Sequence, residues 1–126
     1  YDKALHEDAR RFETGTLNSV GIAGLKASAD LLNETGMATV GKRIVELTDY
    51  LCEGLLELGF SILTPRNPEE KSGIVTFSRE GVDPAAEEAR LRDRRIIATV
   101  RNGCVRLSPH FYNSEEEIRE VLAALN

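Results

Sequence analysis

The stretch that decides the fold reads IIATVRNGCVRLSPHFYNSEEE and occupies residues 96–117. At its centre, Asn102-Gly103 separates two runs of β-branched and apolar residues, which is the strongest short signal for a β-hairpin. We therefore predict strands over residues 96–101 and 104–108. Ser114, followed three residues later by Glu117, forms a capping box that predicts a helix to the end of the chain.

Two helices are predicted on the N-terminal side of this hairpin. Residues 19–33 carry apolar and small side chains at three- and four-residue steps on more than one face, so we expect a helix that is covered on most sides. Asn18 or Ser19 caps its start and Gly36 ends it. A third, shorter helix is expected over residues 3–10, in a segment that otherwise has little periodicity.

The helix predicted over residues 40–58 has a single apolar stripe and a charged opposite face. We expect Thr39 to cap its start and Gly59 to end it. Cys52 lies beside the stripe, where a small buried thiol is the expected environment. The stripe consists of Val40, Ile44, Leu47, Leu51, Leu55 and Leu58.

The middle of the chain adds two strands and one helix. Residues 60–64 and 73–78 have strand composition and are separated by a polar loop. Asp83-Pro84 is a helix-start signal, and residues 85–94 continue with good helix formers. Helices segregated beside an antiparallel or mixed sheet predict an α+β fold, a two-layer sandwich.

Composition narrows the class of protein. The chain has 126 residues, with 16 Lys and Arg against 21 Asp and Glu and a net charge of −5. It therefore lacks the basic field that nucleic acid or an anionic membrane requires, and we expect neither as a partner. Its two cysteines suit a reducing, cytoplasmic compartment. Tyr1 stands where a natural start would carry Met, which favours a processed chain or an excised fragment.

The sequence has no residues at metal-ligand spacing, no phosphate-binding glycine loop and no nucleophile elbow. His6 and His110 are isolated. The charged residues Glu87-Glu88 and 90–94 are interpreted as a solvated helix face. We therefore expect no metal site.

Two segments are candidates for binding. Gly15-Thr16 precedes a helix and offers a hydroxyl and an approachable backbone N–H, which suit an anionic oxygen. A simple turn with a helix cap explains the same residues. Further on, alternation along the strand places Arg106 on the face opposite to the one that carries Val105 and Leu107. Its guanidinium is suited to a carboxylate held by two parallel hydrogen bonds, or to a neighbouring surface Glu.

Three motifs in this order resemble the class V aminotransferases, which are fold-type I pyridoxal phosphate (PLP) enzymes. The motifs are RFETGTLN at 11–18, GIVTF at 73–77 and RLSPHFYNSEEEI at 106–118. The family includes cysteine desulfurases, selenocysteine lyases and isopenicillin N epimerase-like proteins. The resemblance covers nearly the whole chain but only the carboxy-terminal third of such an enzyme. It implies a junction segment from the large domain at 1–18 and the small C-terminal α+β domain at 19–126.

The resemblance also implies roles for the two candidate segments. Gly15 and Thr16 would reach the phosphate of the PLP bound to the neighbouring subunit of a homodimer. Arg106 would bind the α-carboxylate of an amino-acid substrate. Asn18 and Arg101 are weaker candidates for the same region.

The Schiff-base lysine of such enzymes lies upstream, in the large domain, and no lysine here has its sequence context. PLP chemistry requires that lysine, so the chain is expected to lack a complete site and to be inactive alone. The full-length enzyme would be an aminotransferase, a lyase or an epimerase. The alternative function is a free-standing module that binds amino acids or dimerises without catalysis.

The short hairpin also bears on the subtype. Cysteine desulfurases carry a persulfide-forming cysteine on a loop between the last two strands, and Asn102-Gly103 leaves no room for that loop. Cys104 is therefore interpreted as a strand residue, and the short-loop branch of the family is favoured.

Overall fold

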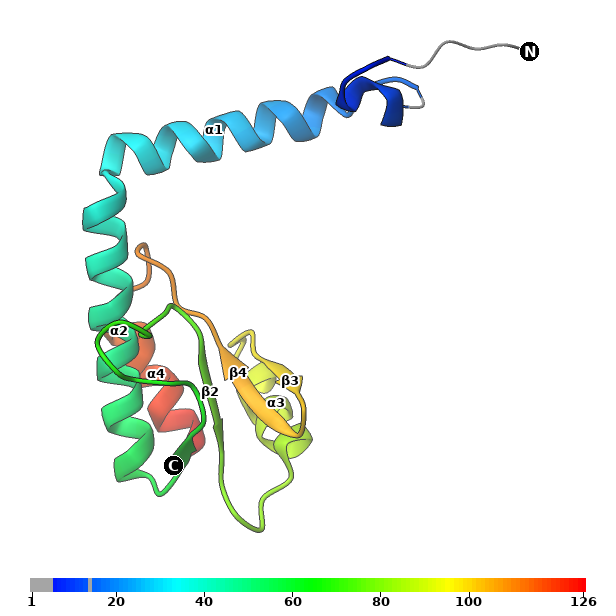
Figure 1. Ribbon diagram of the computed structural model, residues 1–126. Coiled ribbons are helices and arrows are strands. Elements are labelled where there is room, and N and C mark those ends of the chain that lie inside the picture. Colours follow the sequence, from blue (N-terminus) through cyan, green and yellow to red (C-terminus); the bar gives the residue numbers. More distant parts are fainter. Residues whose placement is uncertain (1–5, 14) are drawn as a thin grey trace. The chain divides into compact units, whose positions relative to one another are not determined.

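The computed structural model describes residues 6–13 and 15–126. The chain forms two compact units, Tyr1–Gly36 and Met37–Asn126 (Figure 1). The predicted division into a junction segment at 1–18 and a small domain at 19–126 concerns the domains of the whole protein, and it stays a prediction.

In the first unit, α1 spans Ser19–Thr35. The Asn18 side chain caps it by accepting a hydrogen bond of 2.9 Å from the Gly21 N–H. Gly36 ends it at φ 85°, a left-handed conformation that favours glycine. The cap and the stop are therefore confirmed. No residue of α1 is buried within the described structure.

The helix expected over residues 3–10 takes a different form where the structure describes it. A single 3-10 helix, η1, spans Ala9–Phe12, and residues 3–5 lie outside the described residues. The Asp8 side chain caps this turn by accepting from the Arg10 N–H. The prediction began too early because Asp8 offers the backbone a cap at that point.

Three helices belong to the second unit. α2 spans Met37–Glu57 and begins two residues before Thr39, so the prediction of a Thr39 cap is wrong. The apolar stripe starts at Val40, but a helix can begin before its first buried residue, and α2 begins at Met37. α3 spans Pro84–Asp93, and α4 spans Glu115–Leu125. Their predicted caps, at Asp83 and in the Ser114 capping box, are confirmed.

The four strands form one antiparallel sheet in the order β1-β2-β4-β3. The hairpin is confirmed: Asn102 and Gly103 have φ of 50° and 72°, the values of a type I′ turn. Every strand is shorter than predicted. The strands are β1 at Ser61–Ile62, β2 at Val75–Ser78, β3 at Thr99–Arg101 and β4 at Cys104–Leu107.

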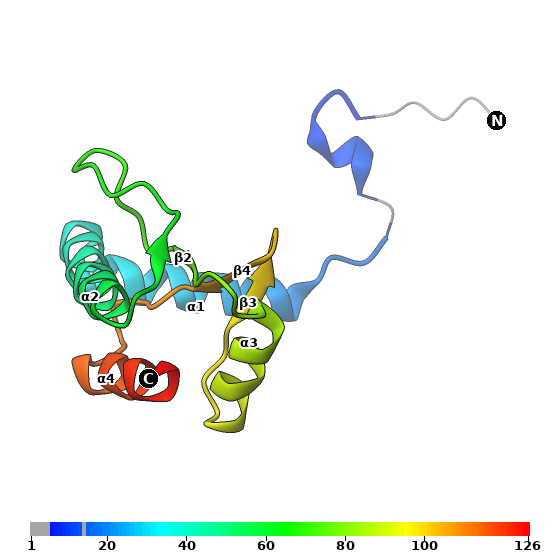
Figure 2. The same ribbon diagram turned by 90° about the horizontal axis from the view of Figure 1, so that it is seen from below.

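The core lies on one face of this sheet. Strand alternation turns Val75 and Phe77 of β2, and Val105 and Leu107 of β4, toward that face, where all four are buried. Figure 2 shows α3 and α4 on one side of the strands. The α+β class with an antiparallel sheet is confirmed. The helices contribute Leu47, Leu51 and Leu55 from α2, Leu91 from α3, and Ile118, Val121 and Leu125 from α4.

One helix face differs from the prediction. Glu87 was expected on a solvated surface of α3 but is only 3% exposed. Its carboxylate accepts hydrogen bonds from Arg79 at 3.0 Å and from Arg90 at 3.2 Å. Arg79 directly follows β2, so only the tertiary structure brings the first pair together.

Candidate functional site

The face of the sheet opposite the core carries polar side chains. Arg106 lies in the middle of it, with Thr99 of β3 and Thr76 of β2 as its partners across the neighbouring strands. Burial of Val105 and Leu107 on the other face confirms the predicted alternation. Cross-strand neighbours in an antiparallel sheet lie about 5 Å apart, so both threonines flank the stem of Arg106.

Arg106 itself is half-buried. Among the described residues it forms no ion pair and no side-chain hydrogen bond. The surface Glu that would have explained this arginine is therefore not found in that part of the chain. A guanidinium with five donors and no protein acceptor is suited to an external anion.

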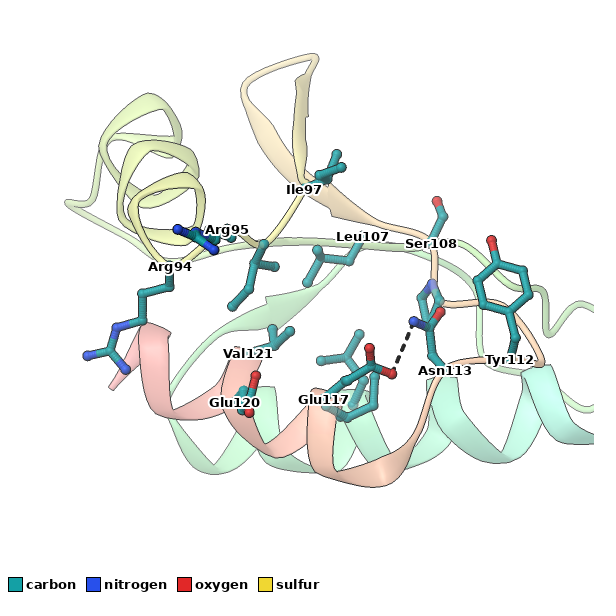
Figure 3. A pocket seen from close by; sticks show the side chains of 14 residues that line it. Arg94, Arg95, Ile97, Leu107, Ser108, Tyr112, Asn113, Glu117, Glu120 and Val121 are labelled. Carbon is teal, nitrogen blue, oxygen red and sulfur yellow. Dashed lines mark hydrogen bonds between the residues drawn. The ribbon is translucent and has the colours of Figure 1, made fainter.

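The segment that follows β4 is held in a defined turn. The His110 N–H donates to Asn113 Oδ1 at 2.8 Å, and the Asn113 N–H donates to the His110 carbonyl at 2.9 Å. Asn113 Nδ2 in turn donates to Glu117 at 3.3 Å (Figure 3). The Ser114 N–H, which donates to Glu117 at 2.7 Å, lowers the pKa of that carboxyl. The turn thus connects the end of β4 rigidly to α4.

His110 is packed among aromatic rings within this turn. Its ring stacks on Tyr112 with centroids 4.9 Å apart and meets Phe111 edge-on at 5.0 Å. Its buried Nδ1 has no hydrogen-bond partner among the described residues. These contacts give His110 a packing role in the β4–α4 connection.

A pocket of about 600 Å³ opens on the helix side of the sheet. Figure 3 shows its wall, formed by Leu107, Val121 and Glu117, with Arg94 and Ile97 at the edge. Arg106 is not among its lining residues. The pocket is therefore distinct from the polar face that carries Arg106.

Gly15 and Thr16 belong to the first unit, where they form an exposed bend before α1. Among the described residues, the Thr16 hydroxyl has no hydrogen-bond partner. Thr14, which directly precedes this bend, lies outside the described residues. This bend is compatible with both anion binding and a simple turn.

Sequence reasoning missed a second charged cluster. Asp49, on the charged face of α2, binds both Arg66 and, at 2.7 Å, Lys71. Burial alone would raise the pKa of Asp49, but these two hydrogen bonds outweigh it and lower that pKa. Burial raises the pKa of the neighbouring Cys52, in line with the predicted inert thiol. The cluster fastens the loop between β1 and β2 to α2.

Within residues 6–13 and 15–126, no group of three or more His, Cys, Asp and Glu side chains is arranged to hold a metal ion. In the same residues, no helix combines the length and apolarity that a membrane span requires.

Solved structures resemble the chain closely. Over 97% of the chain, it superposes on an apo cysteine desulfurase from Thermococcus onnurineus NA1 with a TM-score of 0.87 and 32% identity. Over 98% of its length, the chain superposes on the cystine C-S lyase C-DES with a TM-score of 0.85 and 27% sequence identity. A C-DES mutant has been solved with glycine covalently linked to its PLP cofactor. The matches cover 34% and 33% of those two proteins.

Curated relatives give the same result. A probable cysteine desulfurase of Pyrococcus abyssi is 31% identical over 134 positions, which include 96% of this chain. The uncharacterized aminotransferase YcbU of Bacillus subtilis is 27% identical over 122 positions and 97% of the chain. The chain spans about a third of the length of these relatives, 33% and 32%.

The family model "Aminotransferase class-V" matches residues 1–122, which is almost the entire sequence. Together with the fold, this match agrees with the resemblance carried by the three sequence motifs. The chain belongs to the class V aminotransferase family.

Proposed function

We propose that this chain is the small C-terminal domain of a PLP-dependent enzyme that acts on an amino acid, and that Arg106 binds the substrate α-carboxylate. The observation that carries the proposal is Arg106, a half-buried residue whose guanidinium forms no ion pair among the described residues. A charged group that is partly withdrawn from water is costly to leave without a partner. A substrate carboxylate would supply that partner through two parallel hydrogen bonds.

The same proposal assigns the cofactor phosphate to Gly15 and Thr16. Their exposed backbone and the free hydroxyl of Thr16 fit a phosphate oxygen, and the partner subunit of a homodimer would supply that phosphate. PLP, when bound, supplies an electron sink for the bonds at the substrate α-carbon. This chain's own residues hold the phosphate, orient the carboxylate and position the domain beside the cofactor.

The lysines support an upstream position for the Schiff-base residue. Each of the three described lysines lies beside a carboxylate, which is unlike a lysine held free for a carbonyl. The pairs are Lys26–Asp30 at 2.6 Å, Lys42–Glu46 at 3.8 Å and Lys71–Asp49 at 2.7 Å.

Within the family, we favour a member that does not carry sulfur on its own cysteine. Cys104 is buried at the start of β4, directly after the two-residue turn. The alignment with the Pyrococcus relative spans 134 positions, more than the 126 residues here, so that relative has residues that this chain lacks. The alignment with YcbU spans only 122. Transfer, lyase and epimerase chemistry all remain compatible with Arg106, and the two free cysteines suit a reducing, cytoplasmic location.

The first test is Arg106→Lys in the full-length enzyme. The substitution keeps the charge but loses the planar pair of donors, so we expect KM for the amino-acid substrate to rise about tenfold. Steady-state kinetics and calorimetry with a carboxylate inhibitor measure this effect. Arg92→Lys, at an exposed arginine of α3 paired with Glu88, is the matched control. An inhibitor affinity within twofold of wild type would contradict the assignment.

The second test uses the 126-residue chain alone. Mixed with PLP, it is expected to give no stoichiometric change in cofactor absorbance and no turnover of amino acids. Absorbance titration and a product assay check this directly. An absorbance band that a single Lys→Ala substitution abolishes would contradict the upstream position of the lysine. Tight binding of free amino acids would instead favour the free-standing module.

A further inference from the structure

The pocket on the helix side of the sheet is not used by the proposed function. Its apolar wall comes from three elements: Leu51 of α2, Leu107 of β4, and Ile118 and Val121 of α4. Its volume of about 600 Å³ lies within the range of about 300–1,000 Å³ that is typical of small-molecule sites. Such sites combine a mostly apolar surface with a few polar groups that orient the ligand.

Two arginines lie at one end of this pocket. Figure 3 shows Arg94 and Arg95 at the end beside α3, whereas Tyr112 lies toward the other end. Within the described residues, neither guanidinium has an ion pair or a side-chain hydrogen bond. An arginine without a protein acceptor keeps its five donors for an external anion.

The backbone of Arg95 is strained. Its φ is 61°, in the left-handed region that favours glycine. The Arg95 N–H donates to the Arg92 carbonyl at 2.8 Å and the Ile96 N–H donates to the Leu91 carbonyl at 2.9 Å, so this residue ends α3 at a place usually taken by glycine. Strain of this kind is concentrated at functional sites. An arginine at this position therefore indicates a use for its guanidinium at the edge of the pocket.

The carboxylates of the pocket belong to α4. Glu117 already accepts hydrogen bonds from the Ser114 N–H at 2.7 Å and from Asn113 Nδ2 at 3.3 Å. Glu120 is the other carboxylate among the lining residues. Both repel an anion, whereas the two arginines attract it. The charges therefore orient an amphipathic anion, with its anionic group toward the arginine end and its apolar part on the pocket wall.

We propose that this pocket binds a small amphipathic carboxylate, with its carboxylate at the two arginines and its alkyl chain on the apolar wall. The ligand covers Ile97 and Tyr112 at the pocket edge, which are 92% and 73% exposed. Covering these side chains removes further apolar area from water. Leu107 lines the pocket, whereas the adjacent Arg106 lies on the other face of the sheet, so this site is separate from the proposed substrate site.

The test measures the binding of octanoate to the full-length protein by isothermal titration calorimetry. We expect octanoate to bind about tenfold more tightly than octanol, because only octanoate has the charge that the arginines bind. We also expect it to bind at least about tenfold more tightly than butanoate, because four more methylene groups contact the apolar wall. Undetectable binding of octanoate, or an affinity equal to that of octanol or butanoate, would overturn the proposal.

A double variant tests the arginine end. Arg94→Gln combined with Arg95→Gln removes both charges there, and we expect it to weaken octanoate binding about tenfold. The matched control combines Arg92→Gln with Arg119→Gln, which removes two charges at exposed arginines that do not line the pocket, and it is expected to keep the affinity. Circular dichroism checks that both variants fold. An unchanged affinity in the first variant, or an equal loss in the control, contradicts the site.

Arg106→Gln separates this site from the proposed substrate site. We expect octanoate affinity to survive the substitution, because Arg106 does not line the pocket. If Arg106→Gln abolished octanoate binding, the ligand would bind at the proposed substrate site instead. That result would overturn this inference and support the proposed function, whose own failure is detected by Arg106→Lys and the substrate.

Discussion

Glu87→Ala is expected to lower the free energy of unfolding of the 126-residue chain by about 3 kcal/mol, the low end for breaking a buried ion pair. The Glu87 side chain is only 4% exposed, whereas those of Arg79 and Arg90 are 29% and 46% exposed. Water therefore compensates part of the loss at the two arginines. Urea denaturation followed by circular dichroism measures the change.

The effect is large because Glu87 fixes an arginine with several other contacts. The Arg79 guanidinium lies 4.5 Å from the centroid of the Phe60 ring and donates to the Leu58 carbonyl at 3.5 Å. Without Glu87, this cation loses its one close carboxylate among the described residues. The end of β2, the start of α3 and the turn after α2 would then lose a common contact.

Glu88→Ala is the matched control. Glu88 is the next residue of α3 and its side chain is 21% exposed, but its partner Arg92 is 67% exposed, so water screens the pair and it contributes little. We expect a change below about 0.5 kcal/mol. Equal destabilisation by the two substitutions would show that Glu87 has no special role.

Gly54→Val is expected to destabilise the chain by about 3 kcal/mol, near the upper range for overpacking. A Cβ at Gly54 would lie 2.3 Å from Leu122 Cδ1 and 3.1 Å from Leu122 Cγ. A side chain at position 54 would therefore displace the half-buried side chain of Leu122 from the contact between α2 and α4. Relief of the clash would need Leu122 to leave its packed position or the two helices to separate.

Gly41→Val, also in α2, isolates this packing effect. A Cβ at Gly41 has no neighbour within 4 Å, so valine there changes only the helix propensity. The propensity difference is below about 1 kcal/mol and favours valine. Thermal unfolding of both variants tests the pair. A Gly54→Val chain as stable as Gly41→Val would contradict the packing argument.

Local signals predicted the backbone well. The Asn102-Gly103 turn, the Asn18 and Asp83 caps and the Ser114 capping box all form as expected. Each depends on residues within a few positions along the chain, so composition and spacing are sufficient. The strand ends were predicted less well. Arg95 adopts φ 61°, and the chain after it joins the sheet only at Thr99.

The candidate site was predicted in part. Strand alternation predicts the face of the sheet on which Arg106 lies, and the burial of Val105 and Leu107 on the other face confirms it. The threonines beside it and the neighbouring Arg101 required the register of β2, β4 and β3. Register depends on which strands pair across the sheet, and no spacing along one strand contains that information.

The same distinction applies to the whole chain. Turn chemistry, caps and apolar periodicity determined the elements, the antiparallel hairpin and the family motifs from the sequence alone. Only the tertiary structure decided that Glu87 is buried, that Asp49 binds two cations, and that Arg101 and Arg106 share one face. Contacts within an element depend on neighbours along the chain, whereas burial and charge pairing depend on residues that folding brings together from distant positions.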